Sequence, residues 1–314
     1  MKILVTGASG FIGSHLKNKL REEGHEVYGM SRRPGQEFQA DIRDTAKVVD
    51  FVRREGIQVV FHLSAALGSH PGGEEYIMDV NYRATRALAE ALIPEPVKFV
   101  FFSSTGVHGN VPPGRPADED SPLSPMSPYE RSKALAEEAV MKARGRGLRA
   151  WIIRPGWVYG PGDRRTFKLF KFLMKNTPLP GNGRNHQHPI YIRDLVEASL
   201  KFLGEPPSPI YIISGDEILT VRELVRVACA SFGCRQERVF FPVTPVLVAS
   251  YPLRWFFSLM GREAPITPAK VSFFTVNREF SVERARRELG FSPAVDFARG
   301  TARAFEWYKR AGWL

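Results

Sequence analysis

A tyrosine and a lysine four residues apart are the side chains of this sequence best suited to acid–base chemistry. Tyr129 and Lys133 belong to the segment Tyr-Glu-Arg-Ser-Lys, which contains the only Tyr-x-x-x-Lys of the chain. On a helix these two positions share a face, and a cation about 4 Å from the phenol would lower its pKa from about 10 to near 7. A tyrosine with such a pKa can act as a general acid or base. The alternative is a surface pair on an amphipathic helix.

Hydroxyl side chains come shortly before this helical pattern, in Ser103-Ser104-Thr105. They follow residues 97–102, a nearly continuous apolar run that is typical of a strand buried on both faces. A hydroxyl at the carboxyl end of that strand can hold a substrate alcohol or carbonyl beside the tyrosine. Together these residues predict hydride-transfer chemistry on a secondary alcohol.

A glycine-rich segment, Gly7-Ala-Ser-Gly-Phe-Ile-Gly13, follows the first apolar run and opens the first helical pattern. Gly7 permits a tight turn, Gly10 lets the backbone approach a pyrophosphate, and Gly13 lets the helix pack on the sheet. The helix N-terminus adds free N–H groups and a positive dipole end. The alternative is an ordinary turn. The residues predicted to contact a dinucleotide are Gly7, Ser9, Gly10, Phe11, Ile12 and Gly13.

The second predicted strand ends in Ser31-Arg32-Arg33, with no acidic residue. An Asp or Glu at this place would bind the ribose 2′-hydroxyl of NAD, whereas arginines with a hydroxyl suit the 2′-phosphate of NADP. The alternative is two solvated arginines in a loop. We predict that Ser31, Arg32 and Arg33 favour NADP over NAD.

Strand-like and helix-like patterns alternate through the first half of the chain. The expected strands are residues 2–6, 25–30, 58–63, 97–102 and 149–153, and the expected helices are residues 10–23, 46–54, 79–92 and 127–142. This alternation predicts an α/β fold with a doubly wound, parallel Rossmann sheet.

Two domains are expected. Residues 1–160 are predicted to form a Rossmann NAD(P)-binding domain, with residues 189–214 returning to it. Residues 161–188 and 215–314 are predicted to form a smaller, interleaved substrate-binding domain. A small-molecule substrate should then lie in the cleft between them, beyond the carboxyl ends of the strands.

The composition excludes several classes of function. The net charge is +11, but the Lys and Arg residues are scattered, so a solvated basic surface is favoured over nucleic-acid binding. The spacing of the only two cysteines, Cys229 and Cys234, fits no zinc or redox motif, and no ligand cluster suggests a metal. Two thiols in so long a chain suggest a reducing, cytoplasmic location. No stretch suggests a signal peptide or stable membrane insertion.

Nine short motifs follow one another along the chain. They are T-G-A-S-G-F-I-G (6–13), A-D-I-R-D (40–44), V-F-H-L-S-A-A (60–66), D-V-N-Y-R-A-T (79–85), S-S-T-G-V-H-G (103–109), S-P-Y-E-R-S-K (127–133), R-P-G-W-V-Y-G-P-G-D (154–163), H-P-I-Y-I-R-D-L-V-E-A (188–198) and F-S-V-E-R-A-R-R-E-L-G-F (280–291). Nearly the whole chain thereby resembles the extended short-chain dehydrogenase/reductases, the epimerase/dehydratase superfamily.

The resemblance implies roles for individual residues. Ser104 is the implied catalytic hydroxyl, Tyr129 the acid/base, and Lys133 the residue that holds the nicotinamide ribose. Helices 79–92 and 127–143 resemble those of the family's homodimer interface. The further implied cofactor contacts are Asp41 and Ile42 at the adenine, Leu63, Ala65 and Ala66 along the cofactor, Asn81 as a structural or proton-relay residue, and Pro155 at the carboxamide.

Departures from the family pattern narrow the expected substrate. Thr105-Gly106 stands where dehydratases carry an Asp-Glu pair. Trp157 and Gln187 stand where many nucleotide-sugar epimerases carry an asparagine and an arginine for the substrate's phosphates. The expected substrate-contacting residues are Thr105, Trp157 and His188. The chain therefore looks more like the branch with 3β-hydroxysteroid dehydrogenases and dihydroflavonol-type reductases.

Three functions remain open from the sequence. The first is a dehydrogenase or reductase acting on an apolar alcohol or ketone, for which the apolar stretch 239–260 would supply a pocket or lid, unless it is simply the core of the small domain. The second is a nucleotide-sugar epimerase or reductase. The third, a catalytically silent cofactor-binding sensor, would not require an intact Ser104, Tyr129 and Lys133.

Overall fold

The centre of the molecule is a seven-stranded sheet in which every neighbouring pair of strands is parallel. The computed structural model describes residues 1–67, 72–243, 245 and 271–314. The strand order is β11-β6-β5-β4-β1-β2-β3, which confirms the doubly wound Rossmann fold. The strands are β1 (Lys2–Thr6), β2 (Glu26–Ser31), β3 (Phe38–Gln39), β4 (Val59–His62), β5 (Lys98–Phe102), β6 (Arg149–Pro155) and β11 (Ile210–Ile213).

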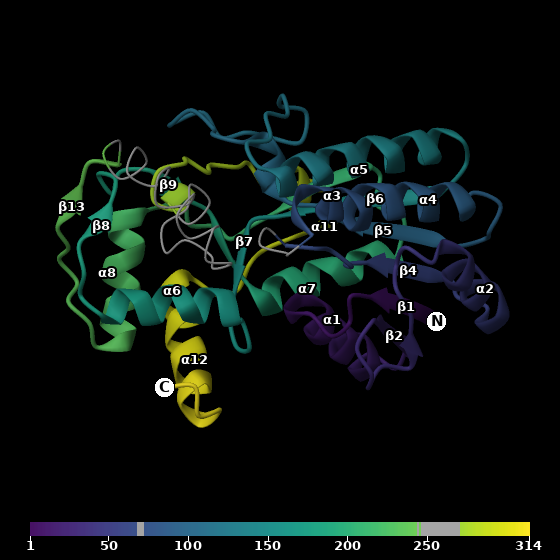
Figure 1. Cartoon of the computed structure of the whole chain (residues 1–314), viewed down its shortest axis with the longest axis horizontal. Coiled ribbons are helices and arrows are strands. Elements are labelled where there is room, and N and C mark those ends of the chain that lie inside the picture. The colour runs from purple at the N-terminus through teal and green to yellow at the C-terminus, as the bar shows by residue number, and fades with distance from the viewer. Residues whose placement is uncertain (68–71, 244, 246–270) are drawn as a thin grey trace.

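Helices cover both faces of this sheet (Figure 1). The helices α1 (Phe11–Glu22) and α7 (Ile192–Leu200) lie on one face. The other face carries α2 (Thr45–Glu55), α3 (Gly73–Met78), α4 (Ala84–Ala91) and α5 (Pro128–Gly145). The helix predicted over residues 79–92 begins as a π-helical turn at Asp79–Arg83 and continues as α4, and α3 precedes it directly.

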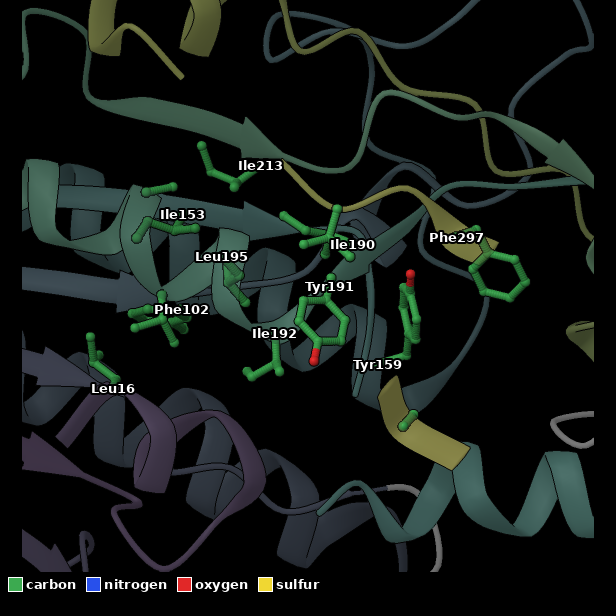
Figure 2. Packing of buried hydrophobic residues seen from close by; sticks show 14 of the residues in the cluster. Leu16, Phe102, Ile153, Tyr159, Ile190, Tyr191, Ile192, Leu195, Ile213 and Phe297 are labelled. Carbon is green, nitrogen blue, oxygen red and sulfur yellow. The ribbon is translucent and has the colours of Figure 1, made fainter. Parts of the chain in front are cut away.

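The strands read as continuous apolar runs because both faces of the sheet are buried. Phe101 points to the side of α2, α4 and α5, whereas its neighbour Phe102 packs on the opposite side. Figure 2 shows that opposite side, where Phe102 and Ile153 from two strands lie near Leu16 of α1 and Leu195 of α7.

A group of shorter elements lies at one end of the sheet (Figure 1). The rings of Tyr159 and Phe297 pack there at 5.0 Å and join two of these elements (Figure 2). The strands of this group pair as β7 (Trp157–Tyr159) with β10 (Pro189–Tyr191), β9 (His186–Gln187) with β12 (Leu219–Thr220), and β8 (Leu179–Pro180) with β13 (Phe240–Phe241). Its helices are α6 (Arg164–Met174), α8 (Val221–Phe232) and α12 (Phe297–Arg310), whereas α11 (Glu283–Leu289) packs against β11.

The two cysteines differ from the expectation of free thiols. Cys229, in the last turn of α8, and Cys234, just beyond that helix, form a disulfide. The left-handed turn at Gly233, with φ of 65°, reverses the chain there, so the two sulfurs meet although the cysteines are five positions apart in the sequence. None of the helices in the described ranges is long and apolar enough to cross a membrane.

Candidate active site

The glycine-rich turn lies where β1 meets α1, and its glycines are required by close backbone contacts. Gly7 has φ of +71°, and a Cβ there would lie 2.9 Å from the Leu63 backbone. A Cβ on Gly13 would lie 2.4 Å from the carbonyl oxygen of Gly7. No side chain caps α1 at Gly10, so its first N–H groups are left for another acceptor. This cradle fits a pyrophosphate; Ser9 lies exposed in the turn, and Phe11, Ile12 and Gly13 form the first turn of α1.

Asn81 links the carboxyl edge of the sheet to the Tyr-Lys helix. Its Oδ1 accepts from the Ala66 N–H at 2.7 Å, and its Nδ2 donates to the Ala66 carbonyl and to Ser132 Oγ, each at 3.0 Å. Ser132 Oγ donates in turn to the Tyr129 carbonyl at 2.7 Å. Asn81 is fully buried in the π-helical turn, a form often found at functional sites. The structure therefore brings together Asn81, Ala66 and the helix of Tyr129.

Leu63 and Ala65 lie in the same loop after β4, and the start of this loop is held to β1. Thr6 Oγ1 accepts hydrogen bonds from the N–H groups of Leu63 and Ser64 at 3.2 and 3.1 Å. Both Leu63 and Ala65 are half-buried. This loop therefore runs beside the glycine-rich turn.

The residues expected around the adenosine are engaged with one another. Ser31 Oγ donates to the Arg33 carbonyl at 2.8 Å, so this hydroxyl already serves a local turn. The Arg32 guanidinium hydrogen-bonds to Tyr76, whose ring also lies under Arg43. Arg33 is exposed.

The two predicted adenine contacts lie just beyond β3. Asp41 accepts hydrogen bonds from Arg43 Nε and Nη2 at 3.1 and 2.8 Å, and these bonds lower the pKa of Asp41. Ile42 is buried. The side chains of Arg32 and Arg43 thus form a cationic group around Tyr76, close to the end of β2.

Helix α5 begins at a well-defined place because its sequence carries a capping box. Ser127 Oγ accepts from the Glu130 N–H at 3.2 Å, and Glu130 Oε2 accepts from the Ser127 N–H at 3.0 Å. Pro128 occupies the first helical position, which needs no N–H donor. The cap places Tyr129 in the first turn and Lys133 one turn later, as the sequence predicts.

The predicted effect of Lys133 on Tyr129 is wrong for this structure. Lys133 Nζ donates to the Phe102 carbonyl at 2.7 Å, at the end of β5. Burial raises the pKa of Tyr129, and the cation that partly offsets this rise is Arg165. Burial also lowers the pKa of Lys133 to about 7, and the negative charge of Glu137 only partly opposes this shift. Desolvation thus outweighs the attraction that i,i+4 spacing alone predicts.

A cavity of about 180 Å³ opens next to Ser104. Ser104 caps the short helical turn Thr105–His108, and its Oγ accepts from the Gly106 N–H at 3.0 Å. All three predicted substrate contacts line the cavity, whereas Tyr129 is not among the lining residues. The lining residues are Ser104, Thr105, Gly106, Glu130, Gly156, Trp157, Gln187, His188, Arg278 and Phe280.

One wall of the cavity is formed by aromatic side chains that pack against one another. Trp157 packs against Phe273 at 5.0 Å, and His188 stacks parallel to Phe280 at 6.2 Å. Burial lowers the pKa of His188 to about 4, and its Nε2 hydrogen-bonds to the Gly215 carbonyl at 2.7 Å. His188 is therefore neutral at pH 7 and shapes the wall.

The predicted cofactor contact Pro155 is not among the residues that line the cavity. Its carbonyl accepts from Thr105 Oγ1 at 3.2 Å, which ties the end of β6 to the turn after β5. Most of the predicted apolar lid, residues 246–260, lies outside the described residues.

The sequence did not indicate Glu130, Arg278 or Phe280 as site residues. Glu130 is recognisable only as the second half of the capping box. Arg278 reaches the cavity from the segment before α11 and contacts Gly106, 172 residues earlier in the chain. No local pattern marks such a residue, because its position depends on how the C-terminal segment packs.

Comparisons with known proteins agree with this arrangement. A 3-beta-hydroxysteroid dehydrogenase of Mycolicibacterium neoaurum is 28% identical, over 98% of this chain and 91% of the relative. A putative UDP-glucose 4-epimerase of Methanocaldococcus jannaschii is also 28% identical, over 98% of each protein.

Solved structures share the fold. MoeE5, solved with UDP-glucose and NAD, is 26% identical and superposes with a TM-score of 0.77 over 99% of each chain. The model of the NAD dependent epimerase/dehydratase family matches residues 3–214, about two thirds of the sequence. The chain therefore belongs to the NAD-dependent epimerase/dehydratase family and is an NAD(P)-dependent enzyme of the extended short-chain dehydrogenase/reductase type.

Proposed function

We propose that the enzyme is a dehydrogenase or reductase that moves a hydride between nicotinamide and a secondary alcohol or ketone with an apolar body. The observation that carries this proposal is the shared cavity of Ser104 and the aromatic residues Trp157 and Phe280. A hydroxyl donor at one end and aromatic surface at the other suit a carbonyl attached to a hydrophobic group.

Individual residues of the chain would bind the substrate, transfer its proton and bind the cofactor. Ser104 would hold the substrate oxygen, and Tyr129 would exchange the proton of that oxygen. The bound nicotinamide supplies the hydride chemistry. Lys133 would hold the nicotinamide ribose. The remaining parts of the cofactor would be held by the glycine-rich turn and by Asp41, Ile42, Leu63, Ala65, Ala66, Asn81 and Pro155. Because burial raises the pKa of Tyr129, the phenol stays protonated at pH 7, which is the form that a ketone reduction needs.

We also propose a preference for NADP over NAD. Strand β2 ends without an acidic side chain, and Arg32 and Arg33 follow it. Arg43 brings a second guanidinium to Tyr76, beside Arg32. Guanidinium groups bind phosphate through charge-assisted, bidentate hydrogen bonds, so this cluster favours a 2′-phosphate.

The proposed organisation has two further parts. Residues 1–160 with 189–214 would act as the cofactor domain, and residues 161–188 with 215–314 as the substrate domain. Helices α4 and α5 would form the interface of a homodimer, where Leu135 of α5 is exposed.

A nucleotide-sugar epimerase is the second candidate, because relatives with that name cover almost the whole chain. Gln187 weighs against it: both of its amide hydrogens are donated to the carbonyls of Phe273 and Val276, at 2.9 and 3.0 Å. This amide is thus committed to the C-terminal segment and brings no charge for a diphosphate.

Calorimetric titration separates the two candidates. Cofactor-stripped protein would be titrated with NADPH, NADH and UDP-glucose, and the spectrum of the protein as purified would be recorded. Reversible, NADPH-selective binding without UDP-glucose binding is the expected result. Retained NAD together with UDP-glucose binding would overturn the proposal in favour of the epimerase.

A further inference from the structure

An ion pair that the proposed mechanism does not use stands in the cavity wall. Arg278 Nη2 donates to Glu130 Oε1 at 2.7 Å, and Arg278 Nη1 donates to the Gly106 carbonyl at 3.2 Å. The side chains of Arg278 and Glu130 are only 16% and 12% exposed. Both residues line the cavity together with Ser104. A mostly buried ion pair beside the proposed reaction centre suggests that one of its members binds the substrate.

Glu130 stabilises the start of α5, but its contacts leave several N–H donors of Arg278 without an acceptor in the described part of the chain. Glu130 Oε2 accepts the N–H groups of Met126 and Ser127 at 2.8 and 3.0 Å and so fixes the start of α5. A guanidinium group carries five N–H donors, and within the described residues the guanidinium of Arg278 makes only two hydrogen bonds. Arg278 therefore has N–H groups to offer to an acceptor inside the cavity.

The spare donors lie close to the catalytic hydroxyl. Gly106 joins the two, because its N–H donates to Ser104 Oγ while its carbonyl accepts from Arg278. A Cβ on Gly106 would lie 3.1 Å from both Ser104 Oγ and Glu130 Oε1, so Gly106 leaves little space between them. Ser104 and Arg278 are thus held on the N–H side and the carbonyl side of one residue, within reach of two oxygens of one small substrate.

The charges around the cavity favour an anion for the second acceptor. Glu130 is the only acidic residue among the described residues that line it. Arg165 also acts on Tyr129, where its positive charge opposes the effect of burial on the tyrosine pKa. Two guanidinium groups, those of Arg278 and Arg165, thus stand against the carboxylate of Glu130 around Tyr129 and the cavity.

We propose that Arg278 binds a carboxylate carried by the substrate, two carbons from the reacting carbinol, so that the substrate is a 3-hydroxy acid or the corresponding 3-oxo acid. This inference rests on the proposed oxidoreductase function. In oxidation the C3–H bond breaks and its hydride passes to the oxidised nicotinamide. The hydroxyl proton passes to the deprotonated, tyrosinate form of Tyr129, and the carboxylate leaves unchanged on the 3-oxo acid.

Glu130 competes with that carboxylate for the same guanidinium. This competition gives the proposal a signature that a purely structural ion pair lacks. Removing the charge of Glu130 should strengthen binding of the acid, whereas removing Arg278 should weaken it. Glutamine at position 130 keeps the capping box, since Gln serves there as well as Glu.

The test compares oxidation of 3-hydroxyhexanoate, 3-hydroxyhexanamide and pentan-2-ol, which share a carbinol but differ in the carboxylate. We expect kcat/KM for the acid to exceed that for the other two by at least ~10-fold, the usual effect of a charge-assisted hydrogen bond. Arg278→Gln should remove this preference, mainly through KM, and Arg278→Lys should keep part of it. Glu130→Gln should increase it. Arg287→Gln, a change at an arginine 71% exposed on α11, is the control and should leave it unchanged.

Equal kcat/KM values for the three compounds in the wild type would overturn the inference and leave the proposed oxidoreductase standing. A loss in Arg278→Gln that is the same for acid and alcohol, with the same loss in Glu130→Gln, would mean a structural pair and would also overturn it. If no compound is oxidised, calorimetry with 3-hydroxyhexanoate decides. Binding that weakens in Arg278→Gln and strengthens in Glu130→Gln supports the carboxylate site, and no binding refutes it.

Discussion

The cofactor edge and the substrate cavity meet at the same ends of the strands but are built differently. The cofactor turn uses seven consecutive residues, and its shape follows from backbone contacts such as that of Gly13 with Gly7. The cavity gathers residues from segments that are far apart in the sequence, as in the contact of Arg278 with Gly106. A short steric motif thus determines the first site, whereas the packing of the C-terminal segment determines the second.

The two regions also treat buried charge differently. Lys133 of α5 donates to a carbonyl and is only 2% exposed, and this burial lowers its pKa to about 7. Arg278, at the cavity side, faces the carboxylate of Glu130. A lysine can give up its proton to relieve such burial, whereas an arginine keeps its charge and needs a counter-ion.

Replacing Tyr129 should separate the two regions most clearly. Tyr129→Phe removes only the proton donor, so turnover should fall by ~10²–10⁴-fold while NADPH affinity stays within about twofold. Turnover assays and calorimetry on the same preparation measure both. Tyr28→Phe, on β2 and away from the cavity, is the matched control. Normal turnover in Tyr129→Phe would remove this tyrosine from the mechanism.

Burial of Lys133 predicts a pH dependence of stability. Its pKa is about 7 in the folded protein and ordinarily about 10.5, so between these values the unfolded chain binds more protons. Stability should therefore rise with pH across this window, by up to about 1.4 kcal/mol per pH unit, and the full cost of the buried charge applies below pH 7. Urea unfolding of cofactor-free wild type and Lys133→Met measures the difference. Parallel pH profiles of the two proteins would contradict the prediction.

A glycine exchange tests whether the cofactor edge is truly steric. Gly13→Ala places a Cβ 2.4 Å from the Gly7 carbonyl oxygen, so it should cost about 1–3 kcal/mol of stability and weaken dinucleotide binding. Gly145→Ala, at the last residue of α5, meets nothing within 4 Å and should be neutral or slightly stabilising. Thermal unfolding and calorimetry compare the two. Equal stability and equal dinucleotide affinity of the two variants would mean that the turn can shift to accept a Cβ at position 13.

The smallest expected effect concerns cofactor choice. The double change Ser31→Asp with Arg32→Ala should weaken NADPH binding roughly tenfold and improve the relative affinity for NADH, because an acidic side chain suits the 2′-hydroxyl and repels the phosphate. Calorimetry with both cofactors checks this. Arg54→Ala, an exposed arginine on α2, serves as control. Unchanged NADPH affinity would remove the Ser31-Arg32 segment from phosphate binding.

Local patterns predicted much of the fold because each depends on neighbours in the chain. Alternating apolar runs indicated the parallel sheet, and Ser127 with Glu130 marks the start of α5. The same patterns were misleading where a tertiary contact outweighs a local one. The first turn of the helix predicted over residues 79–92 is the π-helical turn that holds Asn81 against Ala66, and the cysteines expected as thiols are paired.

By itself, then, the sequence determined the Rossmann sheet, the glycine cradle and the placement of Tyr129 and Lys133 on one helix, because spacing along strands and helices fixes these. Only the tertiary structure decided which groups face Ser104 and how strongly burial shifts the pKa of Tyr129 and of Lys133. Desolvation and counter-ions depend on everything packed around a group, and Arg278 reaches its place beside Glu130 only when the C-terminal segment folds back over the sheet.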